Sequence, residues 1–285
     1  MGKNNKIFIY SLLGIGGISL FSCIDNPVDR KNQRPNIIFI FTDDQGWGDV
    51  HYNRNQYLET PVMDYLARNS VNFGRFYVSP LSAPSRASFL TGRYHLKTGV
   101  SHVSKGMEVM QDREVTIAEM LKEAGYVTAC YGKWHNGEHF PYHPNGQGFD
   151  HFFGFCAGHL GNFFNPRLEY NGKEIKTKGY ITDILTDSSL AFIRENSDQP
   201  FFCYMPYNVP HAPFQVPDMY FDKYKKMGFG NATACVYGMI ENLDENLGRI
   251  LKVLREEDIE ENTILVFASD NGPNGKYRYN GGMKG

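Results

Sequence analysis

Apolar runs of strand length alternate with helical patterns along most of this chain. The clearest run is Ile-Ile-Phe-Ile-Phe after Asn36, which is apolar throughout, as in a strand that is buried on both faces. The strand-like runs are 36–41, 126–131, 201–205 and 263–268, and the helical patterns are 116–123, 183–196 and 232–256. This alternation predicts an α/β fold with a mostly parallel central sheet and helices on both faces.

Two segments carry further local signals. Thr116 with Glu119 three residues later has the spacing of a capping box, and Gly125 marks the end of that helix. The segment from 132 to about 179 is rich in Gly, His, Phe and Asn and shows little periodicity. We expect this segment to be a long loop region that shapes one wall of a substrate pocket.

Length and charge restrict the class of protein. The chain has 285 residues, of which 41% are hydrophobic, so it can bury a substantial core in one large domain or two small ones. The formal net charge is −2 and the sequence pI is about 6.5. A chain without a basic excess gives no sign of a nucleic-acid partner.

The N-terminus has the composition of a targeting segment. Lys3 and Lys6 precede an apolar run over 7–21, which is marginal in length for a membrane-spanning helix but typical of a secretory signal. The run closes with Leu-Phe-Ser before Cys23, which resembles a bacterial lipobox; the alternative is an ordinary signal peptide with an incidental cysteine.

We therefore expect a lipoprotein signal peptide over 1–22, a polar tether over 23–34 and a catalytic domain over 35–285. Cleavage would precede Cys23, and a lipid on that cysteine would anchor an exported bacterial lipoprotein to the membrane, in the periplasm or at the outer membrane.

Besides Cys23, the chain has four cysteines, and in an exported protein these allow three disulfide pairings. Cys130 and Cys203, however, lie within strand-like runs. A buried free thiol is the state that this placement favours for both.

Three polar clusters follow three of the strand-like runs. Asp43 and Asp44 follow the first, Lys133 and His135 follow the second, and Asp270 with Asn271 follows the last. Each cluster alone could be a turn, but parallel strands bring their carboxyl ends to one edge of a sheet, where ligands bind. The acidic and amide side chains offer hard oxygen ligands, which suit Ca²⁺ or Mg²⁺.

A further motif places a nucleophilic side chain at the predicted start of a helix. It reads Ser82-Ala-Pro-Ser-Arg86, followed four residues later by Leu-Thr-Gly-Arg93. A helix start offers free N–H groups and a positive dipole end, which suit chemistry on an anion. Taken alone, Ser82 could instead be an N-cap in a solvated loop.

With its two parts together, this motif resembles the signature of the type I sulfatases of the alkaline phosphatase superfamily. The resemblance covers essentially all of 35–285. It implies that Ser82 is oxidised to formylglycine, the catalytic aldehyde, and that one Ca²⁺ is held by residues of these motifs. The implied metal ligands are Asp43, Asp44, Ser82, Asp270 and Asn271, and the implied catalytic residues are Ser82, Arg86, Lys133, His135, His211 and Lys284.

The resemblance also implies roles for these groups. Arg86, Lys133 and Lys284 would surround the sulfate with positive charge, His211 would protonate the leaving alcohol, and His135 would help to expel sulfate. The substrates would be sulfated carbohydrates of host or algal glycans, with galactose or N-acetylgalactosamine sulfates as the first expectation. A serine at the modified position implies a radical S-adenosylmethionine maturation enzyme as a partner.

The family's proteins usually continue beyond the position that corresponds to Gly285, into a smaller C-terminal subdomain that we expect to be absent here. We expect a chain that ends at this point to fold poorly or to turn over substrate weakly. Two alternative functions remain: a phosphomonoesterase or phosphodiesterase that uses unmodified Ser82, and a truncated relic that binds glycans without catalysis.

Overall fold

A seven-stranded sheet runs through the part of the chain that the structure, a computed structural model, describes: residues 34–275 and 278–282. Its strand order is β5-β4-β3-β2-β6-β1-β7. The strands are β1 (Asn36–Thr42), β2 (Val127–Lys133), β3 (His151–Phe155), β4 (Arg167–Tyr170), β5 (Lys173–Lys176), β6 (Phe201–Pro206) and β7 (Thr263–Ser269). Neighbours from β3 to β7 along this order are parallel, whereas β4 pairs antiparallel with both β3 and β5. This mostly parallel sheet confirms the predicted fold class.

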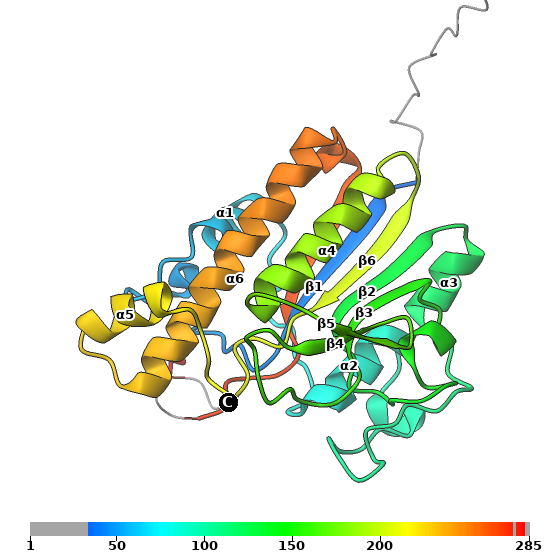
Figure 1. Cartoon of the computed structure of the whole chain (residues 1–285), viewed down its shortest axis with the longest axis horizontal. Helices are drawn as coiled ribbons and strands as arrows, with labels where there is room; N and C mark the ends of the chain where they lie inside the picture. The colour runs from blue at the N-terminus through cyan, green and yellow to red at the C-terminus, as the bar shows by residue number, and fades with distance from the viewer. Residues whose placement is uncertain (1–33, 276–277, 283–285) are drawn as a thin grey trace, which may run out of the picture. The chain divides into compact units, whose positions relative to one another are not determined.

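Helices cover both faces of the sheet (Figure 1). The helices are α1 (Pro61–Asn69), α2 (Ser82–Thr91), α3 (Ile117–Glu123), α4 (Ile181–Glu195), α5 (Asp218–Lys226) and α6 (Asn231–Glu256). The long helices α4 and α6 lie side by side on one face, whereas α2 and α3 pack on the other. Among the described residues, we find no helix with the length and apolarity needed to cross a membrane.

Two hydrophobic cores, one on each face, explain why the run between the two ends of β1 is apolar throughout. Ile38 and Ile40 of β1 belong to the core under α4 and α6. Phe39 and Phe41, which alternate with them, contact the core beneath α2 and α3. Because successive side chains of a strand point to opposite faces, a strand between two cores carries no polar position.

The segment from 132 to 179 corrects the sequence prediction, because it supplies β3, β4 and β5 rather than one long loop. The strand β3 pairs in parallel with β2 and places Gly154 opposite Gly132. A Cβ atom on Gly154 would lie 1.9 Å from the carbonyl oxygen of Gly132, so this close approach requires glycine. A glycine inside a strand interrupts the apolar run by which strands are recognised.

Several local predictions are confirmed. Thr116 and Glu119 form the capping box at the start of α3, and Cys130 and Cys203 are buried free thiols. Helix α2 begins at Ser82, as the motif indicated. The predicted signal peptide and Cys23 lie outside the described residues, as does nearly all of the predicted tether.

Candidate active site

The three predicted polar clusters meet at the carboxyl ends of β1, β2 and β7. The ammonium Nζ of Lys133 donates to Asp43 Oδ2 at 2.7 Å, and the backbone N–H of Asp44 donates to Asp270 Oδ1 at 3.2 Å. Lys133 and Asp270 are fully buried, and Asp43 is almost so. The parallel arrangement of these strands therefore gathers side chains from positions more than 200 residues apart in one buried group.

Ser82 lies at the first position of α2, with its hydroxyl directed into this group. Its Oγ accepts a hydrogen bond from Arg86 Nε at 2.9 Å and lies 3.2 Å from His135 Nδ1. The proline at position 84 fits the first turn of the helix, where a backbone N–H would have no intrahelical partner. The helix start thus fixes the hydroxyl between a cation and an imidazole.

Arg86, one helical turn after Ser82, holds several parts of the site at once. Its guanidinium donates to Asp270 Oδ2 from Nε at 3.1 Å and from Nη2 at 2.8 Å, and to the carbonyl of Lys133 at 3.1 Å. The side chain is fully buried, and it lies over the ring of Phe41. Each of its three nitrogens donates to a protein group, so Arg86 positions the other site residues.

The charges of the site are strongly coupled. Burial raises the pKa of Asp43 to about 6, against the opposing charge of Lys133. Burial would also raise the pKa of Asp270, but the charges of Arg86 and Lys133 outweigh it and hold this pKa at about 2. With Asp44, three carboxylates face the two fixed cations Arg86 and Lys133, which leaves an excess of negative charge.

That excess and the donor types suit a hard divalent cation. Asp43 Oδ1 is buried and accepts no hydrogen bond, so one carboxylate oxygen is free to be a ligand. Asn271 donates from Nδ2 to Asp44 Oδ1 at 2.6 Å, and rotation of its amide would present the oxygen to a cation instead. Asp44 has a φ of 63°, in the left-handed region that is uncommon for non-glycine residues. These residues fit Ca²⁺.

His135 is held as a neutral imidazole against Ser82. Its Nε2 donates to the carbonyl of Val103 at 3.0 Å, which leaves Nδ1 as the acceptor that faces Ser82 Oγ. Burial and then the nearby charge of Lys133 lower the pKa of His135 to about 3. Its φ of 64° also lies in the left-handed region. A neutral Nδ1 in this position can take a proton from a hydroxyl at position 82.

His211 lies in the loop after β6 and is close to the same group of residues. In this loop, the carbonyl of Val209 accepts a hydrogen bond from the N–H of Asp43. Its Nδ1 bonds to the carbonyl of Ala212, and its Nε2 lies 3.8 Å from Asp44 Oδ2. Unlike His135, it keeps part of its side chain exposed, so it can meet a substrate from the solvent side. Lys284 lies outside the described residues.

The sequence reasoning missed Arg278. This residue is buried, donates from Nη2 to the carbonyl of Asp44, and places Nη1 3.3 Å from Asp49 Oδ2. Burial raises the pKa of Asp49 to about 6 despite this cation. Arg278 thereby fixes the backbone of a candidate metal ligand. Its only sequence signal is its place shortly after the Asp-Asn-Gly cluster.

Comparison with known proteins identifies the family. A sequence model described as Sulfatase matches residues 35–284. The chain belongs to the sulfatase family. The solved structure of Ps i-CgsB in complex with k-i-k-neocarrahexaose resembles this sulfatase with a TM-score of 0.79 and 33% identity, over 85% of this chain and 59% of that one.

Two mammalian sulfatases are similar to this chain in sequence over about half of their own length. N-acetylgalactosamine-6-sulfatase of Homo sapiens is 32% identical over 269 residues, which cover 84% of this chain and 50% of the human protein. Arylsulfatase J of Mus musculus is 30% identical, over 84% of this chain and 43% of the mouse protein. The chain thus spans about half the length of the curated relatives it matches.

Proposed function

We propose that this chain carries the catalytic centre of a sulfatase that hydrolyses sulfate esters of carbohydrates. The observation that carries the proposal is the placement of Ser82. Its Oγ, at the start of a helix, lies within hydrogen-bond distance of Arg86 Nε and His135 Nδ1, beside the buried carboxylates of Asp43 and Asp270. Membership of the sulfatase family supports the same reaction.

Ser82 is proposed to become formylglycine, whose hydrate carries two hydroxyl groups on one carbon, one to accept the sulfuryl group and one to release it. His135 stands 3.2 Å from this position with Nδ1 unprotonated, so it takes the proton of the hydroxyl that expels sulfate. The oxidation needs a partner, and a radical S-adenosylmethionine maturation enzyme would supply the oxidising chemistry.

Asp43, Asp44, Asp270 and Asn271 are proposed to hold one Ca²⁺, together with the group at position 82. A calcium ion there would stabilise negative charge that builds on the sulfuryl oxygens. The protein's own contribution is to hold the carboxylates apart: Lys133 bonds to Asp43, and Arg86 bonds to Asp270. Because Lys133 is fully buried in this bond, we assign it to charge balance and positioning beneath the sulfate.

His211 is proposed as the general acid for the departing alcohol. Its Nε2 is the ring atom that faces the site, and its partial exposure leaves room for a sugar on that side. Lys284 is proposed to add positive charge to the sulfate pocket, as the family resemblance implies. The proposed substrate class is supported by a relative whose name is N-acetylgalactosamine-6-sulfatase.

The test is sulfate release by protein matured together with a serine-type maturation enzyme, with an aryl sulfate and with N-acetylgalactosamine 6-sulfate. We expect turnover that a calcium chelator lowers and that Ser82→Ala abolishes. An aryl phosphate preferred over the aryl sulfate would instead support the phosphoesterase alternative. Sugar binding without sulfate release by fully modified protein would support a non-catalytic relic.

The location is a separate proposal: an exported bacterial lipoprotein, in the periplasm or at the outer membrane, anchored through Cys23. Its support is the pattern of the first 23 residues alone. Detergent partition of the native protein and of Cys23→Ala tests it. We expect only the native protein to enter the detergent phase, and equal partition of both would overturn the anchor.

A further inference from the structure

A second cluster of metal-ligating side chains lies apart from the carboxylate site. His143 comes from the loop after β2, Cys156 directly follows β3, and Glu169 belongs to β4. One donor atom from each, a ring nitrogen, a thiol sulfur and a carboxylate oxygen, lies within 4.8 Å of the other two. His143 and Cys156 are buried, and neither has a part in the proposed sulfatase chemistry.

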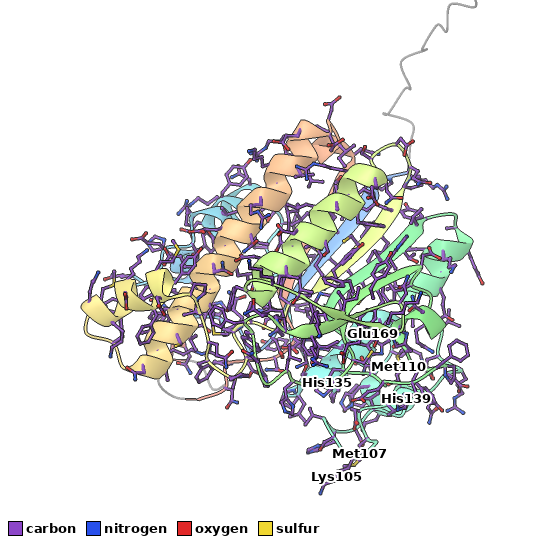
Figure 2. The ribbon with its side chains drawn as sticks, viewed as in Figure 1. Lys105, Met107, Met110, His135, His139 and Glu169 are labelled. Atoms are coloured by element: carbon purple, nitrogen blue, oxygen red, sulfur yellow. The ribbon has the colours of Figure 1, made fainter. Side chains whose placement is uncertain are left out.

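The cluster opens into a cavity of about 640 Å³, which Glu138 and His139 also line. Glu169 and His139 are labelled in Figure 2. The one arginine of the cavity wall, Arg167, is paired with Glu174 at 2.9 Å. Glu138 and Glu169 therefore leave this wall with an excess of negative charge, which favours a cation over an anionic sulfated sugar.

We propose that His143, Cys156 and Glu169 bind a divalent transition-metal ion, with Zn²⁺ the best fit to their donors. Mixed nitrogen, sulfur and oxygen ligands select zinc over calcium or magnesium, which require oxygen alone. Three protein ligands leave one position of a tetrahedral zinc site for a water molecule from the cavity. The site would be distinct in chemistry and in place from the carboxylate site around Asp43.

The protons can be followed through binding. In the structure His143 Nε2 donates to Glu169 Oε1 at 2.6 Å, and Nδ1 accepts a long bond of 3.2 Å from the N–H of Asn145. On metal binding Nε2 becomes the ligand, the ring proton moves to Nδ1, and the bond from Asn145 is given up. Glu169 keeps its bond from the N–H of Gly172, and Cys156 releases its thiol proton to solvent.

The charges around Cys156 favour a cation, whereas its burial opposes ionisation of the thiol. Burial, and then the charges of Glu169 and Glu138, raise the pKa of its thiol far above the usual range. Burial, the larger cause, disfavours the thiolate and attracts no cation, whereas the negative charges of Glu169 and Glu138 do attract a divalent ion. A metal ion in direct contact with the sulfur then stabilises the thiolate.

A metal ion bound here would also stabilise the backbone of the candidate active site. The carbonyl of Cys156 accepts the backbone N–H of His135 at 3.0 Å, and the carbonyl of Phe155 accepts that of Trp134 at 3.0 Å. A bond from Cys156 to a metal held by Glu169 of β4 would fix the end of β3. His135, which depends on that strand end for its backbone position, would be held with it.

The competing interpretation is a salt bridge between His143 and Glu169 that holds the turn between β4 and β5 in place without any metal ion.

Metal titration distinguishes the two interpretations. The full chain is titrated with Zn²⁺ alone, and then with Co²⁺, in saturating Ca²⁺ and a non-thiol reductant. A cobalt–thiolate charge-transfer band reports directly on a cysteine ligand, so this readout does not depend on enzymatic activity.

We expect one zinc per chain and a thiolate band. Cys156→Ser should weaken zinc binding by about a hundredfold or more and remove the band, since even loss of a residue behind a ligand weakens zinc sites ten- to a hundredfold. Glu169→Gln, which keeps an oxygen acceptor for Gly172, should weaken binding similarly. Cys235→Ser, at a half-buried thiol on α6, should change neither.

Two results would overturn the proposal. The first is the absence of zinc binding by a folded native chain. The second is zinc binding that Cys156→Ser leaves unchanged, which would place the ion elsewhere. If Cys156→Ser proved unfolded by circular dichroism, Glu169→Gln and the thiolate band of the native chain would decide.

Discussion

Of the cations that the resemblance placed around the sulfate, Arg86 bonds to more groups of the candidate site than Lys133 does. It bonds to the Ser82 hydroxyl, the Asp270 carboxylate and the Lys133 carbonyl while fully buried. A guanidinium can do this because its donors form a planar fork, which the single nitrogen of a lysine cannot reproduce. The planar geometry of the Arg86 guanidinium therefore positions the site residues, in addition to its positive charge.

Arg86→Lys keeps the charge and removes the fork. We expect turnover of an aryl sulfate by the matured protein to fall by about a hundredfold or more, because a displacement of about 1 Å at a reacting group has that effect. Arg93→Lys, at a half-exposed arginine that pairs with Glu114, is the matched control and should retain turnover. Equal turnover by native protein and Arg86→Lys would show that charge alone suffices.

His135 gives a second prediction at this scale. Because burial and Lys133 lower its pKa to about 3, its imidazole should stay neutral as the pH falls through 6.5, the ordinary value. The ring resonances in an NMR titration, assigned by their loss in His135→Gln, report the protonation state. A midpoint near 6.5 would contradict the lowered pKa of His135.

The elements show what could be predicted from the sequence and what could not. The continuous apolar runs of β1, β2, β6 and β7 predicted the strands, and parallel pairing then predicted that Asp43, Lys133 and Asp270 meet. The strand β5 escaped prediction because all four of its side chains are exposed, so it carries no apolar pattern. The contact of Arg278 with Asp44 was not predicted, because it depends on the path of the chain after β7, which no sequence pattern indicates.

The contact between β2 and β3 can be tested with matched glycines. A Cβ atom in Gly154→Ala would lie 1.9 Å from the Gly132 carbonyl oxygen, so the two strands must separate. We expect a loss of at least about 2 kcal/mol in the free energy of unfolding, as for other overpacked positions. Gly161→Ala has open space around it and should change stability by less than about 0.5 kcal/mol.

Urea unfolding followed by circular dichroism measures both variants. Because Gly132 directly precedes Lys133, separation of the strands should also disturb the bond from Lys133 to Asp43. An unchanged unfolding midpoint for Gly154→Ala would mean that the strands can part without cost.

In the molecule as a whole, the sheet separates two hydrophobic cores and presents its charged groups at one edge. The carboxylates of Asp43, Asp44 and Asp270 exceed the cations Arg86 and Lys133 at that edge, so the folded state itself is strained by like charge. A bound divalent ion relieves this repulsion. Folding stability and metal binding should therefore be linked.

We expect saturating Ca²⁺ to raise the melting temperature and a chelator to lower it. A ligand at a hundred times its dissociation constant adds about 2.7 kcal/mol to the free energy of unfolding. Asp44→Asn should lose most of this response, whereas Asp187→Asn, at an exposed carboxylate on α4, should keep it. If calcium raised the melting temperatures of both variants equally, Asp44 would not be a ligand of the metal ion.

The proposed oxidation of Ser82 is tested most directly by the mass of the tryptic peptide 76–86, from protein made together with a serine-type maturation enzyme. We expect a peptide that is two hydrogens lighter, with the change at Ser82 and with reactivity towards a hydrazide. An unmodified serine in protein that nevertheless releases sulfate from an aryl sulfate would contradict the proposed oxidation.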